Sequence, residues 1–358
     1  MNAPARVGVL GCGVISRQYA ENAKAFDSFE LVACADLDEA QALALAETHG
    51  LAAVSVAELV ADSSIDVVLN LTPPAVHATV VREALAAGKH VYTEKPLDVT
   101  VAEAAELVAD AGRRDLRLGV APDVFLAGPY QAARRLIDDG AIGEPLAVSA
   151  AMLAGGQSSW HPNPDIFYRD GAGPLLDMGP YYLTSIVALL GPVKAVTGIA
   201  TTLVAERRIE IGPRKGETFG AFTPTHTAAV LELETGPSAT LIVSFEAPTQ
   251  YYAQLGIHGA DGVLELPDPN YFGGPVRLAE KRMETREVPY ESRGGMDTRG
   301  IGLHDLVRAV AEDRPHRASG RLGHHVVDVA RTILRAAEEG RRLEVTSSVE
   351  QPAPMPVA

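Results

Sequence analysis

The sequence predicts an α/β protein with two parts: a doubly wound parallel sheet at the N-terminus, then an α/β domain with a large, mostly antiparallel open sheet. In the first 120 residues, short apolar runs alternate with helical stretches, which is typical of parallel strands covered by helices on both faces. Between residues 193 and 288, strand-like runs follow one another with turn signals between them, which favours antiparallel hairpins. The length of 358 residues suits about two domains.

Residues 1–124 are expected to form the first domain. Its strand-like runs are almost entirely apolar, as expected for strands that are buried on both faces. These runs are Val7–Leu10, Leu31–Ala35, Asp66–Leu71, His90–Thr93 and Leu116–Val120. The helical stretches between them are Ile15–Lys24, Glu39–Thr48, Val76–Ala87 and Val101–Arg113.

Residues 125–345 are expected to form the second domain. A helix over Tyr130–Asp138 and a strand over Pro145–Leu153 lead into a polar loop over 155–173 and a helix over 175–190. The later strand-like runs are Ala228–Glu234, Thr240–Glu246, Gln254–His258 and Val263–Leu266. The closing helices are Leu303–Ala311 and Val326–Glu339. Residues 346–358, with three prolines near the end, are predicted to be a flexible tail that is disordered or loosely docked.

Composition and charge exclude several classes of protein. The net charge is −15, so the surface should repel a nucleic-acid backbone, and no nucleic-acid partner is expected. No apolar run approaches the roughly 18 residues of a membrane span, and the N-terminus lacks a secretory signal pattern. Two cysteines cannot form a disulfide framework, and the ten histidines form no metal-ligand spacing. We therefore expect a cytoplasmic protein with no membrane partner and no bound metal.

A glycine-rich motif follows the first strand and opens the first helix. It reads Gly11-Cys12-Gly13-Val14-Ile15-Ser16, the dinucleotide fingerprint GxGxxG with serine in place of the third glycine. Gly11 permits the tight turn, Gly13 lets a pyrophosphate approach the backbone, and the helix start at Val14 and Ile15 offers free amides. The order of strand, motif, helix, strand and acid predicts a dinucleotide site, and a purely structural turn is the alternative.

An acidic residue ends the second strand, 25 residues after Gly11. Asp36 is suited to accept hydrogen bonds from the adenosine ribose hydroxyls, and its charge would repel a 2′-phosphate. The next four residues contain no arginine or lysine that could hold such a phosphate. We therefore predict NAD rather than NADP as the cofactor. The alternative interpretation is an aspartate that only caps the next helix.

Two further strand ends carry residues that are expected at the same edge of the sheet. Thr72 and Pro73 follow the run Asp66–Leu71, and His77 lies just inside the next helix. Ligands of doubly wound sheets bind at the carboxyl ends of the strands. Thr72, Pro73 and His77 are therefore predicted to contact the cofactor, although a histidine in this setting is often structural.

Glu94-Lys95-Pro96 follows the run His90–Thr93. The chain holds six lysines against 25 arginines, so a lysine at the end of a buried strand is an unusual choice. A lysine can give up or regain a proton once burial lowers its pKa, and an arginine cannot. Glu94 and Lys95 are predicted to line the cofactor, with Lys95 also active in proton transfer. A solvated strand-end lysine is the alternative.

A second polar cluster lies in the later domain. Asp177 and Tyr181 are four residues apart, so on a helix they share one face. Gly173 and Gly179 allow other backbone or a ligand to approach closely. Asp177, Tyr181 and Lys95 together make a plausible set for proton transfer, and a solvated polar pair on a helix is the alternative.

At this point the chain resembles the glucose–fructose oxidoreductase / inositol dehydrogenase (Gfo/Idh/MocA) family along nearly its whole length. The matching segments are GCGVIS at 11–16, Asp36, TPPAVH at 72–77, EKP at 94–96 and GAGPLLDMGPYY at 171–182. The resemblance implies an NAD-dependent dehydrogenase or reductase acting on a CH–OH or C=O carbon of a sugar, polyol or related small molecule. It also implies a Rossmann domain joined to a domain whose open sheet makes oligomer contacts.

Carried over by position, the resemblance makes Lys95 the catalytic lysine and Asp177 the motif aspartate. Tyr181 stands where many members have a catalytic histidine and some have tyrosine. Either Lys95 or Tyr181 could therefore accept the substrate proton. The family also implies a cis peptide bond between Lys95 and Pro96. The sequence departs from the family at Ala121-Pro122-Asp123, where many members have an Asn-x-Arg-Phe-like stretch.

Substrate contacts are expected from aromatic and histidine side chains around the second cluster. Trp160 could stack on the apolar face of a sugar, or could serve only in packing. The candidates are Trp160, His161, Tyr168, His226 and His304.

Two alternative functions are compatible with these motifs, and the predicted sheet favours an oligomer. An NAD-dependent glycosidase with an internal redox cycle would share these motifs. A non-catalytic NAD(H)-sensing protein would retain Gly11, Gly13 and Asp36, but would not need Lys95, Asp177 and Tyr181 together. The antiparallel sheet has too few following helices to cover both faces, so a homodimer or homotetramer through this sheet is predicted.

Overall fold

The computed structural model describes residues 3–247, 251–280, 284–292 and 298–356. The chain divides into two compact units. Unit 1 contains residues 1–127, 292–324 and 355–358, and unit 2 contains residues 128–291 and 325–354.

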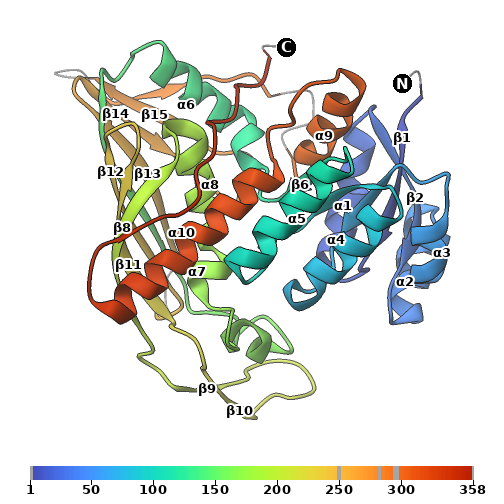
Figure 1. The fold of residues 1–358 in the computed structure, drawn as a ribbon. Helices are drawn as coiled ribbons and strands as arrows, with labels where there is room; N and C mark the ends of the chain where they lie inside the picture. Colours follow the sequence, from blue (N-terminus) through green and yellow to red (C-terminus); the bar gives the residue numbers. More distant parts are fainter. Residues whose placement is uncertain (1–2, 248–250, 281–283, 293–297, 357–358) are drawn as a thin grey trace. The chain divides into compact units, whose positions relative to one another are not determined.

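Unit 1 is built on a parallel six-stranded sheet with the order β3-β2-β1-β4-β5-β6 (Figure 1). The order reverses direction between β1 and β4, which is the doubly wound arrangement expected from the sequence. Its strands are β1 (Ala5–Leu10), β2 (Phe29–Ala35), β3 (Ala52–Ala53), β4 (Val67–Asn70), β5 (His90–Thr93) and β6 (Leu118–Val120).

Helices cover this sheet, and several begin at side-chain caps. Asp38 accepts a hydrogen bond from Ala40 N at the start of α2, and Thr100 accepts one from Glu103 N at α5. Ser55 and Glu58 form a capping box at α3. The helices are α1 (Val14–Asn22), η1 (Ala23–Ala25), α2 (Glu39–His49), α3 (Val56–Ala61), η2 (Pro74–Val76), α4 (His77–Ala86), α5 (Val101–Arg113), η3 (Val124–Leu126) and α9 (Ile301–Ala311).

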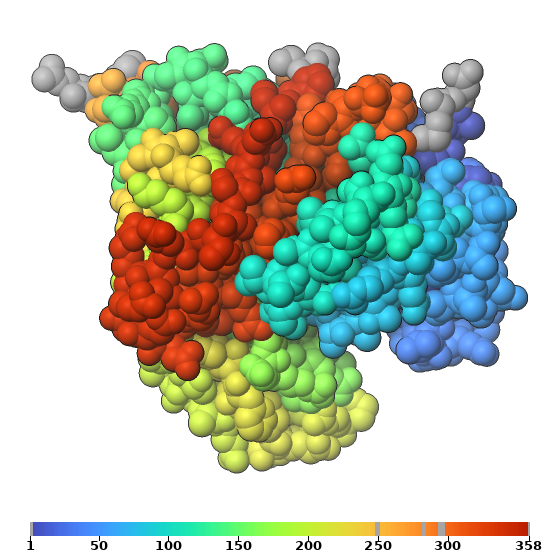
Figure 2. Space-filling view, in the orientation of Figure 1, coloured from blue at the N-terminus to red at the C-terminus, as the bar shows by residue number. Residues whose placement is uncertain are grey.

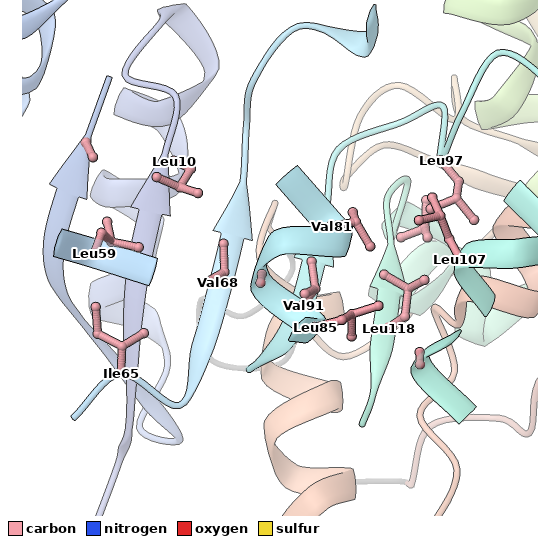
Figure 3. Packing of buried hydrophobic residues seen from close by; sticks show 14 of the residues in the cluster. Leu10, Leu59, Ile65, Val68, Val81, Leu85, Val91, Leu97, Leu107 and Leu118 are labelled. Atoms are coloured by element: carbon pink, nitrogen blue, oxygen red, sulfur yellow. The ribbon is translucent and has the colours of Figure 1, made fainter. Parts of the chain in front are cut away.

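The core of unit 1 lies between the sheet and its helices. Leu10, Val68 and Val91 project from the strands toward Val81 and Leu107 of the helices (Figure 3). All of these side chains are buried, and burial of each aliphatic side chain contributes about 1.5–3 kcal/mol. The strand ends that carry the glycine motif, Asp36, Thr72 and Lys95 therefore rest on a rigid support.

The division of the chain differs from the predicted boundary at residues 124 and 125. Residues 292–324 return to unit 1, where Val120 N donates to Ala318 O (2.9 Å) and Gly119 pairs with Ser319. Helical periodicity indicates that α9 has a buried face, but not which unit buries it. The assignment of residues 292–324 to unit 1 could therefore not be predicted from the sequence.

Unit 2 contains a nine-stranded sheet with the order β16-β15-β14-β13-β7-β12-β11-β8-β17. Only the β7–β12 pairing is parallel; the others are antiparallel, as predicted. Its strands are β7 (Pro145–Leu153), β8 (Val193–Thr201), β11 (His226–Leu233), β12 (Ser238–Ser244), β13 (Tyr252–Gly259), β14 (Gly262–Leu266), β15 (Val276–Glu280), β16 (Arg286–Val288) and β17 (Leu343–Glu344).

Helices pack on one face of this sheet. On that face Leu231, Leu241 and Val243 are buried, whereas alternate residues such as Val230 and Ile242 are exposed on the other face. The helices are α6 (Gly128–Asp138), η4 (Pro164–Tyr168), α7 (Pro174–Asp177), α8 (Gly179–Leu190) and α10 (Gly320–Glu339), whose first residues belong to unit 1.

A small lobe extends from the sheet of unit 2. The strands β9 (Glu206–Arg208) and β10 (Thr218–Gly220) form a separate two-stranded sheet. The lobe joins the loop over 155–173, since Glu210 N donates to Ser158 O (3.0 Å) and Phe222 N donates to Tyr168 O (2.7 Å). Figure 2 shows these green and yellow-green segments projecting together at the bottom of the view. The strands β9 and β10 were not among the strands predicted from the sequence.

Residues 346–352 are hydrogen-bonded to unit 2, whereas a flexible tail was predicted. Asp328 of α10 accepts hydrogen bonds from Thr346 N (3.0 Å) and Ser347 N (2.7 Å). Further along, Arg134 Nη1 donates to Pro352 O (3.0 Å). Prolines restrict the backbone but leave carbonyls free to accept, so a proline-containing segment can still be held.

Candidate active site

The glycine motif occupies the turn between β1 and α1. Gly11 has a φ of +95°, and a Cβ there would lie 2.7 Å from backbone atoms of Leu71 and Thr72, so only glycine fits. A Cβ at Gly13 would meet nothing within 4 Å, which leaves open space at the amino end of α1. This is a suitable cradle for a pyrophosphate.

Ser16 explains how this motif works without its third glycine. Its side chain is buried, and its Oγ donates to Gly13 O at 2.6 Å. The hydroxyl thus bonds back into the turn, and the position accepts a small polar side chain. The serine preserves the turn rather than disrupting it.

Asp36 lies at the carboxyl end of β2, beside the glycine motif. Its carboxylate accepts hydrogen bonds from Cys12 N (2.7 Å) and Asp38 N (2.9 Å). These two amides fix the carboxylate at the edge of the sheet, where it can accept from ribose hydroxyls. The residue type and its position fit an NAD site.

The turn after β4 is held by Asn70. Its side chain accepts from Thr72 Oγ1 (2.6 Å), while its amide donates to Thr93 Oγ1 (3.0 Å) at the end of β5. Asn70 therefore links two adjacent strand ends, and Thr72 and Pro73 lie at the carboxyl edge as predicted. Asn70 was not predicted as a site residue, because no sequence motif marks a buried asparagine within a strand.

Glu94 is a buried carboxylate next to Lys95. It accepts from Tyr19 Oη (2.9 Å), and Arg299 Nε lies 4.0 Å from it. Burial, with the neighbouring Glu94, raises the pKa of Tyr19 well above its ordinary value, so the phenol stays protonated and donates. The bond between Lys95 and Pro96 is cis, which confirms that expectation.

Arg299 and Asp123 are functional-site supports that sequence reasoning missed. Arg299 Nη1 also donates to Gln18 Oε1 (2.9 Å), which ties residues 298–302 to α1. Asp123 accepts from Gly300 N (3.1 Å) and Gly302 N (2.8 Å) at the start of α9. Burial raises the pKa of Asp123, against the lowering effect of these amides and of Arg299. In the sequence, Asp123 was marked only by the departure from the family pattern at residues 121–123. The peptide bond between Ala121 and Pro122 in this segment is cis.

His77 is placed differently from the prediction. Its side chain is fully buried, and its two ring nitrogens each lie 2.7 Å from a carbonyl oxygen, that of Pro96 and that of Thr72. A buried ring with both nitrogens engaged cannot reach a cofactor. The predicted contact is therefore replaced by a link between two strand-end loops.

In unit 2, Asp177 is the last residue of α7 and Tyr181 lies in the first turn of α8. The single predicted helix over 175–190 is interrupted at Met178. Gly173 precedes α7 with a φ of +88°, and a Cβ there would lie 2.8 Å from Pro224 O. Glycine at this position lets the turn before Asp177 pack closely against the segment that precedes β11.

Gln157 contacts Asp177 and was also missed by sequence reasoning. Its Nε2 donates to Asp177 Oδ2 at 3.2 Å, and its side chain is buried. The carbonyl of Gln157 accepts from His161 N (2.9 Å). The loop that carries Trp160 and His161 is thereby linked to Asp177.

Trp160 and His161 form an aromatic cluster with Phe167. The ring centroids of Trp160 and His161 are 5.5 Å apart, and those of His161 and Phe167 are 5.1 Å apart. Trp160 is 59% exposed, so its indole is available to a ligand. An exposed aromatic ring could stack on the apolar face of a sugar, and this role of Trp160 stays a prediction.

Tyr168 and His226, also predicted to contact the substrate, are not part of this aromatic cluster. Tyr168 is fully buried between Phe219 and Phe245, with Arg207 4.8 Å above its ring, so it is a packing residue. His226 pairs with Ser244 on the face of the sheet opposite α7.

His304 lies at the amino end of β2, the edge remote from the strand ends described above. Its Nδ1 is 2.7 Å from Ser28 Oγ, and its ring stacks on Phe26. Exposure in a loop or helix cannot be read from residue type alone. For this reason the sequence did not distinguish the buried Tyr168 from the exposed Trp160.

Comparison with known proteins gives the family. A model described as an oxidoreductase family with an NAD-binding Rossmann fold matches residues 5–121, and the GFO/IDH/MocA C-terminal domain matches residues 130–265. A dTDP-3,4-didehydro-2,6-dideoxy-alpha-D-glucose 3-reductase from Streptomyces violaceoruber is 34% identical, over 97% of this chain and 95% of that protein. The chain belongs to the Gfo/Idh/MocA family. It is an NAD-binding oxidoreductase, as predicted.

Two further proteins are similar over nearly the whole chain. An inositol 2-dehydrogenase from Rhizobium meliloti is 27% identical, over 95% of this chain and 99% of that protein. The structure of levoglucosan dehydrogenase in complex with NADH and L-sorbose has a TM-score of 0.83 at 21% identity, covering 96% of this chain and 99% of that chain. That likeness confirms the fold. No helix in the described part of the chain is long and apolar enough to cross a membrane.

Proposed function

We propose that this protein transfers hydride between NAD(H) and a CH–OH or C=O carbon of a sugar, polyol or related small molecule. The observation that carries the proposal is the edge of the parallel sheet in unit 1. There the turn at Gly13, the carboxylate of Asp36 and the Lys95 loop follow the carboxyl ends of β1, β2 and β5. A dinucleotide bound along this edge would extend from Asp36 toward Lys95.

Bound NAD supplies the hydride chemistry, and the residues of this chain position the substrate and move the proton. Oxidation of a carbinol requires a base within about 2.6–3.2 Å of the hydroxyl oxygen. We assign Lys95 to contact that oxygen and to accept its proton or to stabilise the alkoxide. Tyr181 would hydrogen-bond the same oxygen and is the alternative base. Asp177 would orient the substrate or hold Lys95.

Relatives support a carbohydrate as substrate. The Streptomyces relative is named for a dTDP-linked deoxyketosugar, and others are named for inositol and D-xylose. The 34% identity over 97% of the chain favours a sugar carried on a nucleotide as a second substrate class beside free sugars and polyols. The exposed Trp160 ring could stack on either a sugar or a base.

The test is an initial-rate screen with NAD and NADH. The panel would contain free hexoses and pentoses, inositols, 1,5-anhydrofructose and dTDP-linked ketosugars, with NADH absorbance as the readout. Saturable turnover of one carbohydrate class supports the proposal. Glycoside cleavage without net change in NADH would instead support the internal redox cycle, and NADH binding without turnover of any member would support a sensing protein.

We further infer assembly through the open face of the nine-stranded sheet, as a homodimer or homotetramer. Exposed aliphatic side chains on that face support this inference. A cytoplasmic location is inferred from Cys12 and Cys34, which are both free and buried.

A further inference from the structure

His77 joins two loops that the chain separates by about twenty residues. It is the first residue of α4, directly after the turn that follows β4. Its Nε2 lies 2.7 Å from Thr72 O, in that same turn, and its Nδ1 lies 2.7 Å from Pro96 O, in the loop after β5. No part of its side chain is accessible to solvent.

The neighbouring strand ends leave this ring little freedom. Asn70 Nδ2 contacts His77 O at 3.4 Å and donates to Thr93 Oγ1 at 3.0 Å. Glu94 N donates to Asn70 O at 2.9 Å. Asn70 thus joins the two strands just before their ends, and the imidazole joins the loops that follow. Lys95 lies between the two points of attachment on its own loop.

The protonation state of the His77 ring sets the number of carbonyl oxygens to which it can donate a hydrogen bond. A neutral imidazole carries one N–H and donates to one carbonyl, whereas the imidazolium donates to both. Burial lowers the pKa of His77, against the raising effect of the two carbonyls and of Glu94, while Lys95 lowers it further. Either state keeps at least one direct hydrogen bond. A hydrocarbon side chain of similar size would keep neither.

We propose that His77 is a positioning residue that fixes the Lys95 loop against the Thr72 loop. The role in turnover rests on the proposed function, because it assumes that Lys95 contacts the reacting oxygen. The mechanical role does not, since it concerns only the two carbonyls. A displacement of about 1 Å of a catalytic group can cost roughly a hundredfold in rate.

The test compares His77→Leu and His77→Gln with a matched control, His316→Leu. His316 is also a histidine of unit 1 whose Nε2 contacts a carbonyl, that of Leu118 at 2.9 Å, but at the amino end of β6. Hydrogen exchange measured by mass spectrometry would follow peptides covering 70–79 and 91–99. We expect both peptides to exchange at least tenfold faster in His77→Leu and to be unchanged in His316→Leu.

Kinetics supply the second measurement. We expect His77→Leu to lower kcat about 10- to 100-fold and to change the Kd for NADH less than about threefold. His77→Gln keeps one side-chain donor group and should restore protection from exchange to one of the two peptides. This variant also provides the test if His77→Leu does not fold. Wild-type exchange in both peptides of the His77 variants would overturn the proposal. If the wild type turns over no carbohydrate, the proposed function fails, but the exchange result still decides the link between the loops.

Discussion

At the scale of single residues, we expect Asp36 to decide between NAD and NADP. Its carboxylate is fixed by Cys12 N and Asp38 N, so its charge cannot turn away from a 2′-phosphate. We expect a preference for NAD over NADP of about 1–3 kcal/mol, the value of one charged hydrogen bond. The ratio of kcat/KM for the two cofactors measures it, and equal or better kinetics with NADP would contradict it.

The preference should be reversible at two positions. Leu37 is 95% exposed, so an arginine there needs no repacking. Asp36→Ser combined with Leu37→Arg should shift the kcat/KM ratio toward NADP, because it removes the repelling charge and adds an attracting one. Leu37→Arg alone is the control and should shift the ratio less, since Asp36 remains.

The proton-transfer assignment is tested at Lys95 and Tyr181. If Lys95 contacts the reacting oxygen, Lys95→Ala should lower kcat by roughly 10²–10⁴ and leave NAD affinity within a few fold. Tyr181→Phe should cost less than that if Lys95 is the base, and as much or more if Tyr181 is. Steady-state rates and NADH fluorescence titrations separate the two effects. Near-normal kcat in Lys95→Ala on the true substrate would overturn the assignment.

Some site residues could be predicted from short sequence motifs. The placement of others depends on packing between segments that are far apart in the sequence. The glycine motif and Asp36 could be predicted because strand, turn and helix follow one another within a short segment. His77 was placed on the correct helix, but its burial depends on what packs over the side chain. Gln157 was missed because its contact with Asp177 joins residues twenty positions apart and no motif marks it.

At the scale of elements, the register of β11 decides on which face of the sheet His226 lies. The run Ala228–Glu234 was predicted as a strand, but β11 begins two residues earlier, at His226. Because side chains alternate between faces, the pairing of His226 with Ser244 puts both on the same face as Val230 and Ile242. Alternation within one strand can be read from sequence. Which face a helix covers depends on segments far along the chain.

The docking of the C-terminal segment on α10 gives an element-scale prediction. Burial alone would raise the pKa of Asp328, but hydrogen bonds from Thr346, Ser347 and Thr332 outweigh it, and the pKa is lowered. A lowered pKa stabilises the fold above the unfolded value of about 3.9, and this stabilisation is lost as pH falls through the folded pKa. We expect Asp328→Asn to lower the free energy of unfolding by about 1–3 kcal/mol at pH 7.

The difference between Asp328→Asn and wild type should shrink below about pH 4, because the wild-type carboxyl then becomes neutral as well. Urea unfolding at several pH values measures this. Glu338→Gln, an exposed site on the same helix, is the control and should change stability by less than about 0.5 kcal/mol. A pH-independent loss in Asp328→Asn would contradict the assigned role of the charge.

At the scale of the whole molecule, the nine-stranded sheet has one face that its own helices do not cover. Cross-strand pairing aligns Ile199, Ala228 and Ile242 in one row, and Val230 lies in the adjacent row of the same face. Ile199 is 66% exposed and Val230 is 47% exposed. Exposed β-branched side chains on paired strands form an apolar surface that usually marks an interface. This is the physical basis for predicting a homo-oligomer.

A charge placed in this face should separate the subunits. Val230→Asp would bury an unpaired carboxylate between two copies of the sheet, which costs several kcal/mol in an interface but little on an exposed strand. We expect the wild type to be a dimer or tetramer by light scattering at micromolar concentration, and Val230→Asp to be smaller. Leu43→Asp, at an exposed leucine of α2 in unit 1, is the control and should leave the mass unchanged. A monomeric wild type would contradict the prediction, as would a Val230→Asp protein that keeps the wild-type mass, because an apolar face in contact with a second copy cannot accept that charge without loss of affinity.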